Sequence, residues 1–176
     1  MKIAITGHRP DKLGGYDFQN PIRQDLFRRL IVELQRLKPS TLFVGGALGF
    51  DTDAARAALK CKIPYILCVP FPNQARRWND VDRQKYEKMK EYAEHVVYVS
   101  DSDPPDSAGV NFAAINMLHA RNRYMVDQCD QVIAAWDGSL GGTHYCVKYA
   151  KKVGKEILVL EPEGITYVIP RSQSTH

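Results

Sequence analysis

Short apolar runs alternate with longer amphipathic segments along the whole chain of 176 residues. The apolar runs, rich in β-branched side chains, predict strands at 2–6, 41–44, 65–69, 96–99, 132–136 and 156–160. Apolar residues spaced three or four apart predict helices at 21–37, 51–60, 78–93, 116–128 and 142–153. Strands that alternate with helices favour an α/β fold in which helices cover both faces of a mostly parallel sheet of about six strands.

The alternation continues without interruption and predicts a single domain over residues 1–169. The polar residues that follow predict a flexible tail, 170–176. No apolar run approaches the length of a transmembrane helix, so we expect no membrane partner. The first apolar run, 2–6, leads directly into a glycine turn, which favours a first strand over a signal peptide.

Three glycine-marked turns, each after an apolar run, are the most informative motifs, and they lie within residues 3–10, 42–51 and 132–143. Glycine lets a ligand approach the backbone closely, and a helix that begins after such a turn directs free N–H groups at an anion. The carboxyl ends of parallel strands meet at one edge of a sheet. The three turns together therefore predict one crevice for a ligand that carries phosphate.

Charge and cysteine content narrow the class of partner. The formal net charge of +4 suits anionic ligands, but the basic residues form no concentrated stripe, so nucleic acid is not expected as a partner. Four cysteines, Cys61, Cys68, Cys129 and Cys146, include no Cys-x-x-Cys pair and no spacing typical of a zinc site. We expect reduced thiols in a cytoplasmic protein, with no metal and no cofactor.

Five motifs occur in an order typical of a known family. They are Ile5-Thr6-Gly7-His8-Arg9-Pro10 with Leu13-Gly14-Gly15-Tyr16; Gly45-Gly46-Ala47-Leu48-Gly49-Phe50-Asp51; Ile63-Pro64 with Pro70-Phe71, Gln74 and Trp78; Arg121-Asn122-Arg123-Tyr124-Met125-Val126-Asp127; and Trp136-Asp137-Gly138 with Gly141-Gly142-Thr143. The chain resembles the YpsA-like (DUF1273-type) proteins of the SLOG superfamily over most of its length.

That resemblance implies a Rossmann-like, three-layer α/β/α domain and a nucleotide-type small molecule as its ligand. Relatives in the superfamily include LOG phosphoribohydrolases, the DNA-processing protein DprA and domains that sense nucleotide-derived signals such as ADP-ribose derivatives. The resemblance also implies a homo-oligomer, a dimer or a larger assembly, from a bacterium or a phage. It does not by itself separate an enzyme from a binding protein.

The second glycine turn predicts contacts from Gly45, Gly46, Ala47 and Gly49. Asp51 follows at the start of the next helix, where its charge would repel a phosphate bound to the same turn. Asp51 either caps that helix or accepts hydrogen bonds from ribose hydroxyls, and one side chain can do both.

The third turn has no carboxylate in the helix that follows it, so Gly141, Gly142 and Thr143 are the better candidates for binding phosphate. The alternative is that Thr143 only caps the helix. The turn resembles the Gly-Gly-x-Gly-Thr turn of the superfamily but has Ser139 and Leu140 before its glycines, with no proline. Asp137 and Gly138, just before it, are candidates to orient a ribose or to form the turn.

Two further groups complete the candidate site. Thr6, Gly7, His8 and Arg9 follow the first strand, where His8 either binds a base or phosphate or is a structural residue. Arg121 and Asn122 belong to the helix near the proline-rich loop. Arg121 either binds a phosphate or forms a salt bridge with a nearby acid such as Asp127 or Asp130.

A LOG-type hydrolase needs a carboxylate beside the anomeric carbon and an arginine on its substrate. In that family the catalytic glutamate lies three residues after the threonine of the Gly-Thr turn, where this chain has Cys146. This departure argues against a hydrolase, although Asp51 and Asp137 remain candidate catalytic carboxylates. We expect a protein that senses or sequesters a nucleotide or an ADP-ribose-like molecule. An N-glycosidase acting on a nucleoside 5′-phosphate is the alternative, and a DprA-like protein that binds single-stranded DNA is the third hypothesis.

Overall fold

The computed structural model describes residues 1–173, and residues 174–176 of the expected tail 170–176 lie outside the described residues. The strands are β1 (Lys2–Gly7), β2 (Thr41–Val44), β3 (Tyr65–Val69), β4 (His95–Tyr98), β5 (Gln131–Ala135), β6 (Glu156–Leu160) and β7 (Thr166–Ile169). The helices are α1 (Pro21–Leu37), α2 (Phe50–Lys60), α3 (Asp80–Tyr92), α4 (Phe112–Gln128) and α5 (Gly142–Lys152), and a short 3-10 helix, η1 (Pro10–Lys12), follows β1. None of the helices in this range is long and apolar enough to cross a membrane.

The strands form one sheet in the order β4-β3-β2-β1-β5-β6-β7, with every neighbouring pair parallel except β6 and β7. The prediction of a mostly parallel α/β sheet is confirmed, but the expected number of strands, about six, is one short. The missed strand, β7, is antiparallel and lies at the edge of the sheet, and its side chains are largely exposed. An edge strand of this kind carries no buried apolar run, which is the signal that identified the other strands.

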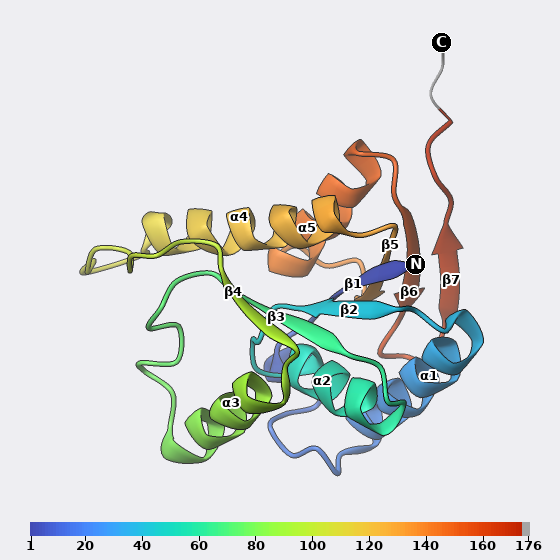
Figure 1. The fold of residues 1–176 in the computed structure, drawn as a ribbon, viewed down its shortest axis with the longest axis horizontal. Coiled ribbons are helices and arrows are strands. Elements are labelled where there is room, and N and C mark those ends of the chain that lie inside the picture. The colour runs from blue at the N-terminus through green and yellow to red at the C-terminus, as the bar shows by residue number, and fades with distance from the viewer. Residues whose placement is uncertain (174–176) are drawn as a thin grey trace.

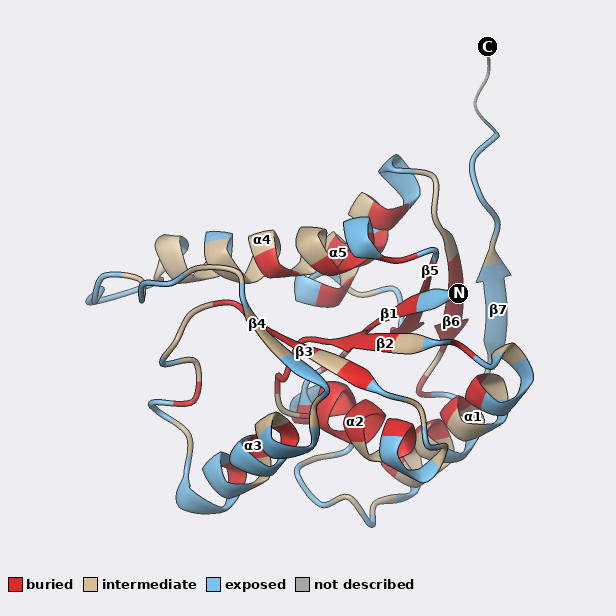
Figure 2. Ribbon diagram, viewed as in Figure 1, coloured by how far each residue is buried: buried red, intermediate tan, exposed pale blue. Residues whose placement is uncertain are grey.

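Helices cover both faces of the sheet and make the three layers seen in Figure 1. On one face, Leu26, Leu30 and Leu34 of α1 join α2 and α3 in one apolar core. On the other face, α4 and α5 pack against the sheet through a second core that includes Met125 and Val147. Figure 2 shows buried residues along the central strands and on the helix faces turned toward them.

Two helix boundaries differ from those expected. Helix α3 begins at Asp80 rather than residue 78, because the Asn79 side chain accepts a hydrogen bond from the Asp82 N–H and caps the helix. Helix α4 begins at Phe112, four residues before the expected position, with Asn111 as its cap. The first turn of α4 projects beyond the sheet (Figure 1), so Phe112 is 72% exposed and this turn lacks the amphipathic pattern of a packed helix.

The strand order reverses direction between β1 and β5. From β1 the chain proceeds outward through β2, β3 and β4, and then returns to place β5 on the other side of β1. Such a reversal opens a crevice at the carboxyl ends of the two central strands, where ligands bind in open α/β sheets. The three glycine turns follow β1, β2 and β5, so all three meet at this crevice.

Candidate functional site

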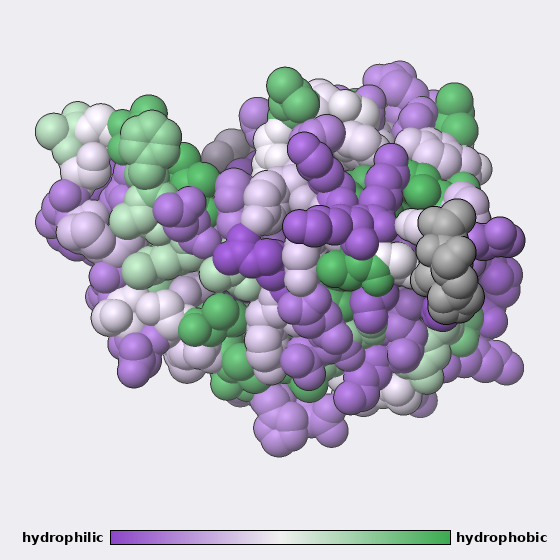
Figure 3. Space-filling view, turned by 90° about the horizontal axis from the view of Figure 1, so that it is seen from above, coloured by the Kyte–Doolittle hydropathy of each residue, from purple (hydrophilic) through white to green (hydrophobic). Residues whose placement is uncertain are grey.

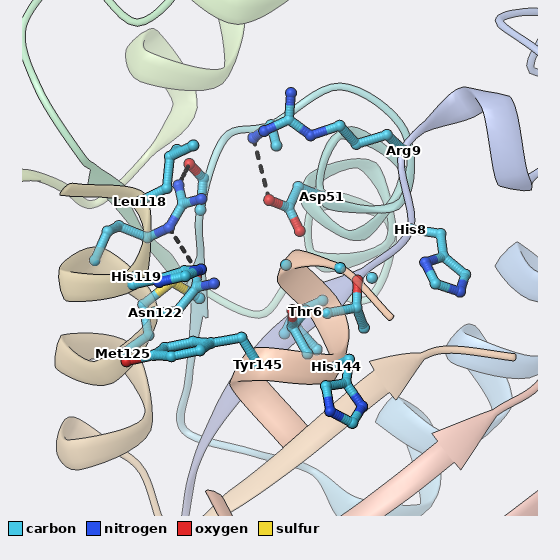
Figure 4. A pocket seen from close by; sticks show the side chains of 18 of the residues that line it. Thr6, His8, Arg9, Asp51, Leu118, His119, Asn122, Met125, His144 and Tyr145 are labelled. Carbon is cyan, nitrogen blue, oxygen red and sulfur yellow. Dashed lines mark hydrogen bonds between the residues drawn. The ribbon is translucent and has the colours of Figure 1, made fainter. Parts of the chain in front are cut away.

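A cavity of about 640 Å³ occupies the crevice, between α4 and α5 and beyond the end of β1 (Figure 4). Its lining comes from four segments: the end of β1 with η1 (Ile5, Thr6, Gly7, His8, Arg9, Asp11, Lys12), the β2–α2 turn with α2 (Gly45, Ala47, Asp51), α4 (Ile115, Leu118, His119, Arg121, Asn122, Met125) and α5 (Gly141, Gly142, Thr143, His144, Tyr145, Lys148). Four lining side chains are cations and two are carboxylic acids, so the cavity favours an anionic ligand.

Gly45 lines the cavity near the start of α2, and the side chains of Arg121 and Asp51 both lie close to it. A Cβ atom placed on Gly45 would lie 2.6 Å from Nη1 of Arg121 and 2.9 Å from Oδ2 of Asp51. Arg121 donates from Nη1 to the carbonyl oxygens of Gly45 and Cys68, and from Nε to Oδ1 of Asn122 at 2.8 Å. A side chain at position 45 would therefore displace the guanidinium group of Arg121 from the carbonyl oxygen of Gly45.

Asp51 is buried and points into the cavity (Figure 4). Burial raises the pKa of its carboxyl, and the charge of Arg121 opposes that shift. Gly49 is the N-cap of α2, so the expectation that Asp51 occupies the capping position is wrong. Asp51 instead lies in the first turn, where Oδ2 accepts a hydrogen bond of 3.1 Å from the N–H of Ala47, and it remains available to a ligand.

Because α4 begins at Phe112, Arg121 lies in the middle of this helix. Its side chain is buried. The alternative expectation, a salt bridge to Asp127 or Asp130, is wrong. The Asp127 carboxylate accepts a hydrogen bond from the Tyr149 hydroxyl, and the Asp130 carboxylate accepts one from the backbone N–H of Lys2. Arg121 therefore directs its charge toward the cavity and Asp51.

The N-terminus of α5 forms the other polar end of the cavity. Gly141 is the N-cap, at φ 144°, so the alternative that Thr143 caps the helix is also wrong. The first helical hydrogen bond runs from the Tyr145 N–H to the Gly141 carbonyl, which leaves the amides of residues 142–144 without an acceptor inside the helix. The first turn contains no acidic residue, so these amides are suited to an anion.

Lys12 reinforces this positive end. Its Nζ donates to Oγ of Ser139 at 2.7 Å and to the carbonyl oxygen of Leu140 at 3.1 Å, which holds the ammonium group over the turn before α5. The same Nζ would lie 3.9 Å from a Cβ atom on Gly141. A cation is thus fixed beside a helix N-terminus, and their electrostatic attractions for an anion add.

Cys146, which the resemblance places where LOG hydrolases have their glutamate, is buried. Burial raises the pKa of the Cys146 thiol to about 11, and the Thr6 hydroxyl opposes that shift. A protonated thiol cannot replace a carboxylate beside an anomeric carbon. The carboxylic acids that line the cavity are Asp11 and Asp51.

His8 and Asp137 link the ends of the two central strands. Nε2 of His8 lies 2.8 Å from Oδ1 of Asp137, and the Asp137 carboxylate also accepts a hydrogen bond from the Ser139 N–H. The hydroxyl of Ser139, then its N–H and His8, lower the pKa of Asp137. Asp137 therefore binds the turn that precedes α5 and orients the imidazole ring, and it does not line the cavity.

Replacing Asp137 by asparagine should reduce stability most at neutral pH. A carboxylate whose pKa is lowered by folding contributes stability above the unfolded pKa, about 4, and loses that contribution as the pH falls toward the folded value. The difference in Tm between the parent protein and D137N should therefore shrink from pH 7 to pH 3. Asp80→Asn, at an exposed position on α3, is the control and should show little difference at either pH. A difference for D137N that does not depend on pH would contradict the expectation.

The structure brings most of the expected site residues to one cavity. Those that line it are Thr6, Gly7, His8, Arg9, Gly45, Ala47, Asp51, Arg121, Asn122, Gly141, Gly142 and Thr143. Gly46, Gly49, Asp137 and Gly138 do not line it. A Cβ atom on Gly46 would face Leu67 and Tyr86, away from the cavity, and one on Gly49 would lie 2.7 Å from the carbonyl oxygen of His8. These two glycines, both at positive φ, shape the β2–α2 turn.

Several lining residues were not among the expected ones, most of them on helices. Lys12 follows the first glycine turn closely, and Tyr145 and Lys148 continue the face of α5 that begins at its N-terminus. Ile115 and Leu118 lie on the same face of α4 as Asn122, and this spacing becomes visible once α4 is extended to Phe112. Within residues 1–173, no cluster of three or more His, Cys, Asp or Glu side chains could hold a metal ion.

Comparison with known proteins decides the family. The YpsA family model, described as the YspA SLOG family, matches residues 3–162. The chain belongs to this SLOG family. A curated relative of this YpsA-family protein, the uncharacterized SPbeta prophage-derived protein YoqJ of Bacillus subtilis, is 30% identical over 169 residues, which cover 86% of the chain and 99% of the relative.

Solved structures show the same fold. DNA processing protein A of Helicobacter pylori, described in terms of its single-stranded DNA binding mode, matches with a TM-score of 0.61 and 22% identity over 90% of this chain. DprA of Streptococcus pneumoniae matches with a TM-score of 0.63 and 20% identity over the same share. The YpsA-family chain spans 64% of the first of these proteins and 49% of the second, and the likeness shows that they share its Rossmann-like fold.

Proposed function

We propose that this YpsA-family protein binds a nucleotide or a nucleotide-derived, ADP-ribose-like molecule in the cavity, as a sensor or a sequestering protein in the cytoplasm. The observation that carries the proposal is the pairing of the free α5 amides with the fixed ammonium group of Lys12 at one end of the cavity. That arrangement suits a phosphate group. Two terminal oxygens of a phosphate can accept from the amides while Lys12 supplies a counter-charge.

The rest of the cavity suits the remaining parts of a nucleotide. Ile115, Leu118 and Met125 of α4 offer an apolar wall for a flat base. Asp51 of α2 and Asn122 of α4 also line the cavity, and their carboxylate and amide groups can hydrogen-bond ribose hydroxyls. A cavity of about 640 Å³ is within the range that binds ligands of this size.

The test is native mass spectrometry of the purified protein with AMP, NAD, ADP-ribose and cyclic ADP-ribose isomers, followed by titration calorimetry of the ligands that bind. Lys12→Gln removes the fixed cation and should weaken binding about tenfold, because a charge-assisted hydrogen bond is lost. Lys152→Gln, in the last turn of α5 and away from the cavity, is the matched control and should leave the affinity unchanged. Equal affinities for both variants, or no binding of any ligand, would overturn the proposal.

A second candidate function is hydrolysis of the N-glycosidic bond of a nucleoside 5′-phosphate. The observation that favours it is Asp51, a buried carboxyl group inside the cavity whose pKa is raised by burial. Such a group could stabilise or protonate a reacting sugar. Release of a free base and a ribose phosphate during the same incubation, abolished in Asp51→Asn, would establish the hydrolase. An intact nucleotide recovered after long incubation would support the sensor.

We also propose that the protein assembles as a homo-oligomer and that nucleic acid is not its partner. Helices α1 and α4 leave apolar side chains exposed, including Val32 at 59% and Phe112 at 72%. Figure 3 shows hydrophobic surface at the left end of the molecule, where α4 begins. The native mass of the protein tests the assembly. An oligonucleotide added to the nucleotide titration tests the DNA-binding hypothesis, because a DprA-like protein would bind it with strong salt dependence.

A further inference from the structure

Two aromatic rings stack beside the apolar wall of the cavity. The imidazole of His119, from α4, and the phenol ring of Tyr145, from α5, lie with their centroids 3.6 Å apart and their planes 6° from parallel. Both residues line the cavity, and the stack joins the two helices that enclose it. In Figure 4 the two rings lie one above the other, and the His119 ring extends toward the interior of the cavity.

The stack is held from outside the cavity. Nη1 of Arg123, one turn of α4 beyond His119, donates a hydrogen bond to the hydroxyl oxygen of Tyr145. Arg123 does not line the cavity, so its charge is directed away from a ligand there. Tyr145 is fixed by this contact, and the face of its ring fixes the plane of His119.

The nitrogen atoms of His119 are free to bind a ligand. In the part of the chain that the structure describes, no residue forms a hydrogen bond with either of them. Partial burial, together with the charge of Arg123, lowers the pKa of His119. The ring is therefore neutral at neutral pH and has one nitrogen that donates and one that accepts.

We propose that His119 is a specificity-determining residue that recognises the polar edge of a nucleobase. The inference rests on the proposed function, since it needs a nucleotide whose phosphate is bound at the α5 end. A neutral ring with one donor and one acceptor matches the amide and amine edges of bases, which carry no net charge. The rigid stack holds that hydrogen-bonding atom in one position, so a base with the wrong group there leaves a polar atom unpaired.

The residues around His119 favour binding of a base over binding of a second phosphate in this part of the cavity. Ile115 and Leu118 lie beside His119 and offer apolar contact rather than charge. Lys148 is exposed at the rim, one turn of α5 beyond Tyr145. The free amides belong to the first residues of α5, and Lys12 of η1 donates hydrogen bonds to the turn before that helix. The cavity thus has one end suited to an anion and another suited to a flat, neutral heterocycle.

The experiment measures the affinities of AMP, GMP, CMP and UMP against that of ribose 5-phosphate, which has the same phosphate and sugar but no base. The parent protein should prefer one of the four nucleotides. His119→Ala should weaken binding of that nucleotide about tenfold, the cost of one unpaired hydrogen bond, and should leave the affinity for ribose 5-phosphate unchanged. His119→Gln, which keeps a donor and an acceptor, should restore much of the preference.

The outcomes separate the inference from the proposed function. If the parent protein binds ribose 5-phosphate and all four nucleotides equally, the inference is overturned while phosphate binding stands. If His119→Ala weakens ribose 5-phosphate as much as the nucleotides, His119 has only a structural role and the inference is overturned. If none of these probes binds, the inference is overturned, and the proposed function is then decided by the titration with NAD, ADP-ribose and cyclic ADP-ribose isomers.

Discussion

Replacing Arg23 by alanine is expected to lower the free energy of unfolding by about 3–5 kcal/mol, because it leaves a buried carboxylate without its partner. Arg23 of α1 forms two hydrogen bonds with Asp53 of α2, from Nη2 to Oδ1 at 2.6 Å and from Nε to Oδ2 at 2.9 Å. The two side chains are only 6% and 1% exposed. Arg23 also donates from Nη1 to the carbonyl oxygen of Tyr16 at 2.7 Å.

This ion pair has consequences for the cavity. Asp53 lies in the first turn of α2, two residues after Asp51, so the pair fixes the end of the helix that directs Asp51 inward. Loss of Arg23 should therefore weaken nucleotide binding as well as stability. Urea denaturation measures the first effect and calorimetry the second.

Two controls make the prediction specific to the buried pair. Arg28→Ala removes an arginine of the same helix whose side chain is 74% exposed and lies 3.7 Å from Asp25. It should change the free energy of unfolding by less than about 1 kcal/mol. The double variant Arg23→Met with Asp53→Leu removes both charges and should recover part of the loss. If Arg23→Ala and Arg28→Ala lowered the free energy of unfolding by similar amounts, the buried pair would stabilise the protein no more than the exposed pair does.

Gly45→Ala is expected to reduce ligand affinity tenfold or more and to lower the free energy of unfolding by about 1–3 kcal/mol. The added methyl group would lie 2.6 Å from Nη1 of Arg121 and 2.9 Å from Oδ2 of Asp51, and neither distance is tolerated. Gly45 does not have a positive φ, so the effect is one of space and not of backbone strain. Arg121 must leave the carbonyl oxygen of Gly45, which disturbs two side chains of the cavity at once.

Gly109→Ala is the matched control, because no heavy atom lies within 4 Å of a Cβ atom at that exposed position and its φ is also not positive. It should leave affinity and stability unchanged. Denaturation and titration of both variants separate the two effects. Retention of full affinity in Gly45→Ala would show that Arg121 and Asp51 do not contribute to binding.

Much of the site could be predicted from glycine positions alone. The turns at Gly7, Gly45 and Gly141 follow buried strands, and strands that alternate with helices must bring their carboxyl ends to one edge of a parallel sheet. The residues that surround these turns therefore converge without knowledge of the strand order. The same reasoning could not distinguish Gly45, which lies against two charged side chains of the cavity, from Gly46, whose free side faces the core.

Residues on helices were harder to assign. Asp51 is only two residues from the N-cap of α2, a difference that decides whether its carboxylate caps the helix or points into the cavity. Arg121 was expected either to bind a phosphate or to form a salt bridge with an acid later in the sequence, Asp127 or Asp130. It donates instead to the carbonyl oxygens of Gly45 and Cys68, which lie far from it in the sequence. Helix ends depend on local caps such as Asn111, whose effect is weaker than that of a whole periodic segment.

Patterns within short stretches of the chain were enough to predict the α/β class, the number of helices and the three glycine turns that meet at the cavity. The tertiary structure alone decided the pairing of Arg23 with Asp53, the contact between His8 and Asp137 and the stacking of His119 on Tyr145. Each of these contacts joins elements that are distant in the chain. Only the packing of α1 against α2, of β1 beside β5 and of α4 against α5 brings these side chains within reach of one another, and no pattern within a short stretch of chain contains that information.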